Sequence, residues 1–578
     1  MQSSPPFSRS HSPTGSPLPP ITWAYLSVAL VICFHLFVTL IYPPDGGYFT
    51  TDEQFIADSG VFMLYGATPR CLDWPGIPMV LVFYLLGLGQ SALNVISAAS
   101  HGGLSAVGVF GIIDQTANAY LLDRIPLIRA GRMVQLLLVA LLLFNTVRTI
   151  YRADSLRLPP VLRLPLVVIL CLQYDCLVWP PAIRPEGLAY ALFTCLAVQL
   201  LFGEQAQRGW RTILLVLTAL LLSQRLLFVF TMPFILGTML VRTGLTWRQA
   251  GRIVGGLLVC LLLTMPFLVT DSLVLLKSFF GGLLMKVNGG AQASFFNWDY
   301  VQTMVLPTPT AWLPVLTLLG SLAFWRFYPN RLIAALLVGN LLLLTLSIFH
   351  SSVIYITHTL PLRTLSVFLL AYSAYGLYRW LGNRMWVLYA ATGLIALSNV
   401  AESVMLEHDL LLPSNLMRAN AYANTLPANA RVLIDATFDN TLARSQKTAL
   451  RELQALQNPV LTGQKFARQF GGKTALNVPV AMQTTLLEDD RLTMLQRQVQ
   501  AQQTPPDRFP DFYFMADVSG FTNYFIDKKQ ALADFRAGQY DYLVTELALP
   551  YDQLKTFDEP SHSKTYYVYK KPTQPALP

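Results

Sequence analysis

The organisation of this chain is clearest from residues 42–76, which read YPPDGGYFTTDEQFIADSGVFMLYGATPRCLDWPG. This stretch follows the first long apolar run of the chain and contains five acidic residues, namely Asp45, Asp52, Glu53, Asp58 and Asp73. Acidic residues are scarce in the sequence around it, because most of residues 21–400 is suited to lipid. A polar, acidic loop between apolar segments is where we expect chemistry.

The composition of the chain is that of an integral membrane protein. Of its 578 residues, 53% are hydrophobic and 13% are charged, and the mean hydropathy is +0.46. Soluble domains typically contain about 25% charged residues. The net charge of +9 is spread as small basic groups between apolar runs, which is typical of orientation signals and argues against a nucleic-acid partner. The six cysteines are scattered, so they predict neither a disulfide framework nor a metal site.

The apolar runs predict about eleven transmembrane helices, and at most about thirteen. The candidate spans are residues 21–41, 131–146, 164–179, 188–202, 213–222, 226–241, 253–269, 311–324, 332–349, 362–378 and 386–400. The division of residues 213–241 into two spans requires a tight turn at residues 223–225. Residues 77–96 are also apolar enough to cross the membrane, or to lie along its surface.

The chain divides into three parts by composition. Residues 1–20 are rich in Ser and Pro and are expected to be a disordered tail. Residues 21–400 form the transmembrane domain, with a large first non-cytoplasmic loop at 43–130, and residues 401–578 read as a soluble domain. In this domain, residues 430–438 and 540–549 are predicted strands and residues 442–457 a predicted amphipathic helix. The predicted fold class is a polytopic α-helical membrane protein with a C-terminal soluble α/β domain.

The distribution of arginine predicts the orientation. Residues such as Arg148, Arg242 and Arg331 make every connection on one side of the predicted helices basic, whereas the short connections on the other side carry few cations. Because basic loops remain in the cytoplasm, we expect the N-terminus there. The acidic first loop and the C-terminal domain then share the non-cytoplasmic side.

The adjacent acids Asp52 and Glu53 are the leading candidates for catalysis. Neighbouring side chains point in different directions, so that one can act as a base while the other orients a partner or the substrate. An arbitrary acidic pair in a loop is usually just solvated. Here, however, the pair directly follows the first span and precedes aromatic residues suited to holding a sugar ring.

Several motifs resemble those of one enzyme group. The segment Thr51-Asp52-Glu53-Gln54-Phe55 follows the first span, and residues 64–69 form an LxxGxxP-like stretch. The segment at residues 73–78, DWPGIP, stands where a Pro-rich motif is expected. Residues 128–132 form an Arg-bearing helix start, residues 184–188 (RPEGL) an RPE-type motif, and residues 359–363 a basic segment near the start of a late helix. Together they resemble the GT-C fold glycosyltransferases that use polyprenyl-phosphate sugars, a group that includes the protein O-mannosyltransferases and the lipid A aminoarabinose transferases.

The resemblance implies that Asp52 is the catalytic base, with Glu53 beside it. In the predicted topology Arg132, Arg184 and Arg363 lie near the outer boundary, where guanidinium groups are suited to gripping a lipid phosphate, although each also has a structural interpretation. The remaining candidate substrate-binding residues are Glu186, His358 and Asp73. Glu186 alternatively pairs with Arg184, and the stretch around Asp73 lacks the common His-Pro-Pro form.

Two further ionisable residues lie within the apolar runs. Asp175 lies near the outer end of its predicted helix, where a functional role and a hydrogen bond to a neighbouring helix are equally good interpretations. His35, in the first span, is expected to be a packed core residue.

The resemblance therefore implies an inverting glycosyltransferase that moves a sugar from a polyprenyl-phosphate donor to an acceptor hydroxyl on the non-cytoplasmic side. The expected partners are membrane lipid, the lipid-linked sugar, and a glycan, lipid or protein acceptor. The expected location is a bacterial inner membrane, with the C-terminal domain in the periplasm. No cofactor other than the lipid-linked donor is predicted, and metal dependence is left open. The alternatives are a lipid-linked sugar transporter or flippase, a polysaccharide polymerase or ligase, and a non-catalytic scaffold.

Overall fold

The computed structural model describes most of the apolar part of the chain and six C-terminal strands. The described residues are 20–41, 56–57, 60, 77–101, 125–181, 183–205, 209–244, 247–265, 312–349, 359–407, 415, 418–419, 422, 425–427, 430, 432–435, 513–517, 526–527, 532–533, 535–545, 547–558 and 565–571. Asp52, Glu53, Asp73 and His358 lie outside these residues, as does the predicted helix at 442–457.

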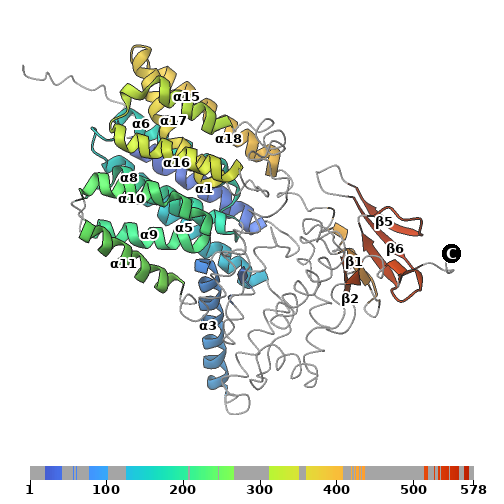
Figure 1. Ribbon diagram of the computed structural model, residues 1–578. Coiled ribbons are helices and arrows are strands. Elements are labelled where there is room, and N and C mark those ends of the chain that lie inside the picture. The colour runs from blue at the N-terminus through green and yellow to red at the C-terminus, as the bar shows by residue number, and fades with distance from the viewer. Residues whose placement is uncertain are drawn as a thin grey trace, which may run out of the picture.

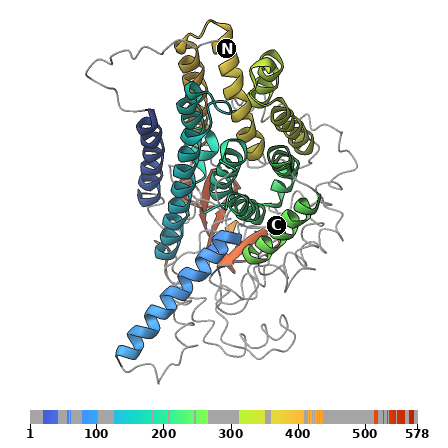
Figure 2. The same cartoon turned by 90° about the vertical axis from the view of Figure 1, so that its left-hand side faces the viewer.

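The apolar part folds into a bundle of helices that pack side by side (Figures 1 and 2). The helices are α1 (Pro20–Ile41), α3 (Ile77–Ser100), α5 (Ile125–Arg152), α6 (Pro160–Cys171), α7 (Tyr174–Val178), α8 (Pro185–Phe202), α9 (Trp210–Gln224), α10 (Met232–Thr243), α11 (Trp247–Thr264), α15 (Leu313–Ala323), α16 (Arg331–Phe349), α17 (Leu360–Trp380) and α18 (Met385–Glu407). Two 3-10 helices, η2 (Leu226–Thr231) and η5 (Trp325–Phe327), precede α10 and α16. Each of the eleven predicted apolar segments contains a helix.

Six of the described helices, α1, α3, α5, α8, α17 and α18, are long and apolar enough to cross a membrane. A rise of about 1.5 Å per residue gives 18 residues a length of about 27 Å, close to the hydrocarbon thickness of a bilayer. Six shorter apolar helices accompany them. The predicted polytopic helical fold class is confirmed, and the chain is a multi-pass membrane protein.

Helix α8 is the centre of the bundle. Every residue of α8 is buried, and it packs against α5, α9 and α17. The outer helices are apolar on their exposed faces as well, as Leu30 and Phe37 of α1 illustrate. A soluble protein would leave such faces in water, whereas in a bilayer they contact lipid tails at no cost.

Helix α3 corresponds to the apolar segment whose placement the sequence left open. Its first half is buried against α5, where Gly131 lies so close to Phe83 that a Cβ there would come within 2.3 Å of the ring. From its ninth residue onward it exposes the apolar side chains of Leu85, Leu88, Leu93 and Ile96. The helix projects away from the other helices (Figures 1 and 2).

The described C-terminal residues form a six-stranded sheet. Its strands are β1 (Val432–Asp435), β2 (Tyr513–Asp517), β3 (Ile526–Asp527), β4 (Tyr542–Thr545), β5 (Gln553–Phe557) and β6 (Tyr566–Lys570), in the order β3-β2-β1-β4-β6-β5. Strands β1 and β4 pair in parallel and the other neighbours are antiparallel. Phe535, Tyr540, Leu543 and Tyr569 form a small apolar core. The two predicted strands of this part are confirmed.

The helix directions bring functional candidates from distant parts of the sequence to one end of the bundle. Helices α5, α8 and α17 begin at this end, while α1, α9 and α18 finish there. Contacts between His35 of α1 and Cys176, and between Gln135 of α5 and Pro180, show that these termini meet. At the opposite end, Arg157 and Arg242 both contact the last turn of α8. We refer to these as the first-loop end and the basic end.

Candidate functional site

The site is built around a break in the chain between α6 and α8. The sequence predicts one span over residues 164–179, but α6 ends at Cys171 and the separate short helix α7 follows at Tyr174. Gln173 is extended between them, and Pro180 and Pro181 follow the end of α7, because a proline has no backbone N–H with which to continue the helix. The break exposes backbone groups that must find other partners inside the bundle.

Side chains from neighbouring helices supply some of those partners. The imidazole of His35, which is fully buried, lies with Nε2 at 2.7 Å from the carbonyl oxygen of Cys176. The amide of Gln135 donates from Nε2 to the carbonyl oxygen of Pro180 at 2.9 Å. His35 is thus a packed core residue, as predicted, and it ties α1 to α7. These bonds fix the position of α7 relative to the long helices.

Asp175 of α7 is fully buried and forms an ion pair with Arg363 of α17, which is 4% exposed. Nε of Arg363 donates to Oδ2 at 2.9 Å, and Nη2 donates to Oδ1. Gln173 and Trp179 also donate to this carboxylate, at 3.2 and 3.3 Å. Both carboxylate oxygens are therefore satisfied, which is the condition for burying a charge in an apolar bundle. Of the two interpretations of Asp175, the structure shows the contact between helices.

The guanidinium of Arg363 also stacks on an aromatic ring. Its Cζ lies 4.9 Å from the centre of the Tyr174 ring, so that the cation has an ion pair on one side and a π face nearby. Arg363 was predicted to grip a lipid phosphate. In the described structure the carboxylate of Asp175 holds its Nε and one Nη2 hydrogen, so any role in substrate binding would fall to its remaining N–H groups.

A second group of charges surrounds Glu186 in the first turn of α8. Glu186 is 1% exposed and forms ion pairs with Arg225, which follows α9, and with Arg184, whose Nε lies 3.5 Å from Oε2. The Cζ of Arg184 lies 4.9 Å from the centre of the Trp179 ring, which links this group to Asp175. The pairing of Arg184 with Glu186, which the sequence offered as an alternative to substrate binding, is present. A carboxylate in the first turn of a helix is also favoured by the helix dipole.

Gly187 allows these two groups to approach each other. A Cβ at this position would lie 2.7 Å from the carbonyl oxygen of Trp179 and 2.9 Å from Nε2 of Gln135. Only a glycine leaves room for the backbone at Trp179 to pack on the start of α8. The Gly187 contact thereby sets the separation between the Asp175 pair and the Glu186 group.

Arg132 is the third predicted cation. It lies in the second turn of α5 and is 2% exposed, one of the largest fully buried side chains of the protein. It lies one helical turn before Gln135, which contacts Pro180. The structure thus brings Arg132, Arg184, Glu186 and Arg363 to the first-loop end. The other four predicted site residues lie outside the described residues.

Two residues at this site, Arg225 and Gln173, were not among the candidates predicted from the sequence. Arg225 entered only as part of the expected tight turn at residues 223–225, and Gln173 was not singled out at all. A polar Ser-Gln-Arg sequence between two apolar runs, at residues 223–225, was the signal for Arg225. Its pairing with Glu186 depends on the packing of α9 against α8, which no local pattern predicts. We call Asp175, Arg184, Glu186, Arg225 and Arg363 the charged cluster.

Metal binding was left open by the sequence. Within the described part of the chain, no group of three or more His, Cys, Asp or Glu side chains is placed to hold a metal ion.

Comparisons with known proteins add one solved structure. No family model matches the chain, and neither does any curated protein. The crystal structure of ArnT from Cupriavidus metallidurans bound to undecaprenyl phosphate is similar to this chain, with 14% identity and a TM-score of 0.44. The similarity covers 96% of this chain and 99% of that chain. ArnT is a GT-C aminoarabinose transferase, from the group that the sequence motifs resemble. At this identity and TM-score, the similarity assigns no residue role here.

Proposed function

We propose that the protein is an inverting GT-C glycosyltransferase that transfers a sugar from a polyprenyl-phosphate donor to an acceptor hydroxyl on the non-cytoplasmic side. The observation that carries the proposal is the charged cluster, which lies at the end of the bundle where α1 finishes and α5 begins. The first loop, with Asp52 and Glu53, leaves and re-enters the helices at that end. Three arginines at one end of an apolar bundle are suited to a phosphate-bearing lipid.

The cations would act on the leaving group. As the bond between the anomeric carbon and the donor phosphate breaks, negative charge collects on the phosphate oxygens. Arg184 and Arg225 keep 20% and 21% of their side chains exposed, whereas Glu186 between them is buried. They are therefore the cations of the cluster that a ligand reaches most easily. Guanidinium groups suit phosphate because they donate two parallel hydrogen bonds.

Asp52 would be the general base. It takes the proton of the acceptor hydroxyl, the hydroxyl oxygen forms a bond to the anomeric carbon, and polyprenyl phosphate leaves with the electron pair of the broken bond. A phosphate leaving group needs little protonation, so the acid of a glycosidase pair is not required. Glu53 would orient Asp52 or the acceptor. The implied location is a bacterial inner membrane with the C-terminal domain in the periplasm, where it would help to recognise a glycan, lipid or protein acceptor.

The buried pair also bears on the transporter alternative. Transporters place broken helices and charges near the middle of the membrane. Here Arg363 lies in the first turn of α17, so the break and the Asp175–Arg363 pair lie at the end of the bundle. This placement favours transfer at the membrane surface over passage through the bundle.

The test uses the full-length protein in liposomes with a panel of polyprenyl-phosphate sugars, and measures the release of polyprenyl phosphate. Asp52→Asn should lower release by about 10²–10⁴-fold, the usual contribution of general acid–base catalysis, while donor binding persists. Asp45→Asn, which removes another acid of the same loop, is the matched control. Unchanged release by the Asp52 variant would overturn the role of Asp52. Movement of intact lipid-linked sugar across the bilayer, without release, would support the transporter instead.

A further inference from the structure

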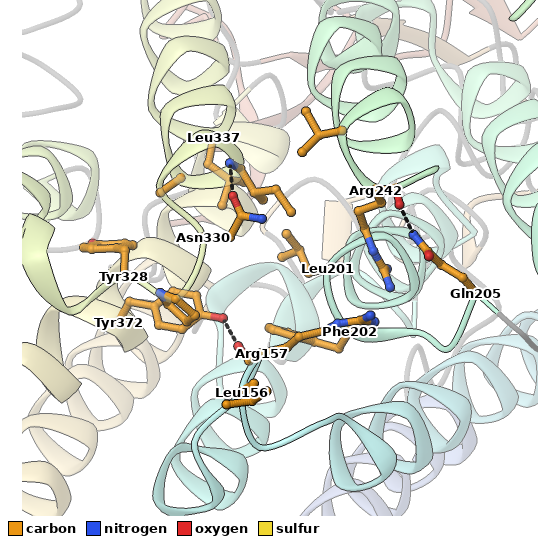
Figure 3. Close-up of a pocket in the computed structure, with 14 residues that line it drawn as sticks. Leu156, Arg157, Leu201, Phe202, Gln205, Arg242, Tyr328, Asn330, Leu337 and Tyr372 are labelled. Atoms are coloured by element: carbon orange, nitrogen blue, oxygen red, sulfur yellow. Dashed lines mark hydrogen bonds between the residues drawn. The ribbon is translucent and has the colours of Figure 1, made fainter. Parts of the chain in front are cut away.

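A pocket of about 290 Å³ lies at the basic end, away from the charged cluster (Figure 3). Its wall is formed by the ends of α8 and α10, the start of α16, Tyr372 of α17, and the connection that follows α5. Its cationic lining residues are Arg157 and Arg242, and no Asp or Glu is among its lining residues. The lining of the pocket therefore carries a net positive charge. Neither arginine has a role in the proposed transfer reaction.

The two arginines are held in place by the C-terminus of α8. Arg242 donates from Nη1 to the carbonyl oxygens of Gln199 and Leu200, at 3.2 and 2.5 Å, and from Nη2 to that of Gly203 at 2.6 Å. Arg157 donates to the same Gly203 oxygen at 3.3 Å. The C-terminus of a helix carries about half a negative charge, so the two guanidinium groups leave an excess of positive charge. This excess is suited to an anion.

Most of the other lining residues are apolar or aromatic, and Gln205 and Asn330 are polar. Phe202 and Leu337 contribute to the lining, together with the rings of Tyr328 and Tyr372 (Figure 3). The hydroxyl of Tyr372 donates to the carbonyl oxygen of Arg157 at 2.8 Å, and that of Tyr328 donates to the carbonyl oxygen of Leu369 at 2.9 Å. Because both hydroxyls are bonded to the protein, the two tyrosines contribute aromatic surface to the lining rather than donors for a ligand.

The surroundings of the pocket expose large apolar side chains. Leu156, in its lining, is 81% exposed, and Leu332, close to it in sequence at the start of α16, is 58% exposed. Both side chains are large and apolar, as expected of a surface that meets acyl chains. Arg152 and Arg331 are exposed at the same end, which the distribution of arginine predicts to be cytoplasmic.

We propose that this pocket binds the phosphate head group of an anionic phospholipid from the cytoplasmic leaflet. Arg157 and Arg242 would contact the phosphate, while the aromatic and aliphatic wall would cover the glycerol and the first part of an acyl chain. A free phosphate ion would use the cations but not the apolar wall, so the wall favours a lipid. Basic pockets between helices on the cytoplasmic side are suited to such head groups.

The experiment measures lipid binding by the full-length protein in detergent micelles, using native mass spectrometry. The probe is dioctanoyl phosphatidylglycerol, with dioctanoyl phosphatidylcholine and inorganic phosphate as comparisons. We expect saturable binding of phosphatidylglycerol, weaker binding of phosphatidylcholine, and little competition from phosphate. Equal binding of the two lipids would overturn the proposal, because the anionic head would not matter. Displacement by phosphate at the same concentration would show a site for a free anion and would also overturn it.

Two arginine variants test whether the lipid binds inside the pocket. Arg157→Gln should weaken phosphatidylglycerol binding about fivefold, the effect of losing one basic residue near an anionic lipid. Arg152→Gln removes an exposed arginine from the same end but outside the lining, and should change binding less than about twofold. Equal losses of phosphatidylglycerol binding in the two variants would indicate diffuse attraction to the basic surface and would overturn the proposal.

A third variant keeps the test decisive if loss of Arg157 disturbs the fold. Ala334→Phe adds a ring to the wall of the pocket without changing any charge, so it should abolish binding by filling the space. Size-exclusion profiles and thermal unfolding confirm that each variant is folded. Full binding by a folded Ala334→Phe protein would contradict a site inside the pocket.

Discussion

Asp175 and Arg363, which are 188 residues apart in sequence, form a buried two-point ion pair that joins α7 to α17. Nε of Arg363 lies 2.9 Å from Oδ2 of Asp175, and Nη2 contacts Oδ1. Because the break after α6 leaves α7 without a continuous helix to support it, this pair fixes the position of the short helix.

The first prediction concerns that pair. Arg363→Gln should lower the free energy of unfolding by about 3–5 kcal/mol, because it leaves the Asp175 carboxylate buried without its counter-ion. The double variant with Asp175→Asn replaces both charges by amides and should recover part of the loss. Thermal unfolding in detergent measures both. A double variant as unstable as the sum of the single variants would contradict direct coupling.

The second prediction concerns Glu186. Glu186→Gln should lower stability by about 1–3 kcal/mol, less than Arg363→Gln, because Arg184 and Arg225 are partly exposed and keep some hydration. Glu204→Gln, the same substitution at an exposed position just after α8, is the control and should be neutral. Chemical denaturation with a fluorescence readout compares them. Similar losses at both positions would show that the ion pairs around Glu186 do not stabilise the fold.

The third prediction concerns the close approach at Gly187. Gly187→Ala places a Cβ 2.7 Å from the carbonyl oxygen of Trp179, a backbone atom that cannot move aside cheaply, so we expect a loss of about 1–3 kcal/mol. Gly89→Ala in α3 is the matched control, since a Cβ there meets nothing within 4 Å. It should be neutral or slightly stabilising, because alanine favours helix more than glycine. If Gly187→Ala unfolded at the same temperature as Gly89→Ala or at a higher one, the close packing at Gly187 would be refuted.

The fourth prediction concerns the bond from α1 to α7. His35→Leu removes the partner of the Cys176 carbonyl oxygen and should cost about 1–3 kcal/mol. Phe34→Leu, at the neighbouring exposed position of α1, should cost less than about 1 kcal/mol. Hydrogen exchange of the amides in α7 provides a local readout, and should speed up in the His35 variant alone. Unchanged exchange in α7 would mean that His35 does not hold this helix.

Much of the membrane fold could be predicted from the sequence. The apolar runs predicted each helical segment, and the basic connections predicted which helix ends would lie together. Residues 164–179 were the exception, because their apolar content concealed the break between α6 and α7. Hydropathy measures how well a segment suits lipid and not whether its backbone is continuous. The signals for the break were the polar residues around Asp175 and the two prolines after Trp179.

The site was predictable in part, for a similar reason. Arg132, Arg184 and Arg363 were singled out because they lie near the predicted outer boundary, where a lipid phosphate is expected, and all three lie at the first-loop end. Their partners were harder to predict, because an ion pair between α7 and α17 depends on which helices are neighbours. The pairing of Arg225 with Glu186 likewise depends on α9 packing against α8.

The order of residues was enough to predict a multi-pass membrane protein, the succession of its helices, and boundary arginines that lie towards one end. These properties depend on transfer of side chains from water to lipid, which is local and nearly additive. The packing of the helices was needed to show that Asp175 pairs with Arg363, that Glu186 is shared by two arginines, and that a basic pocket forms at the opposite end. Those outcomes depend on distances between helices far apart in the chain, where charge burial is tolerated only in the geometry that pairs it.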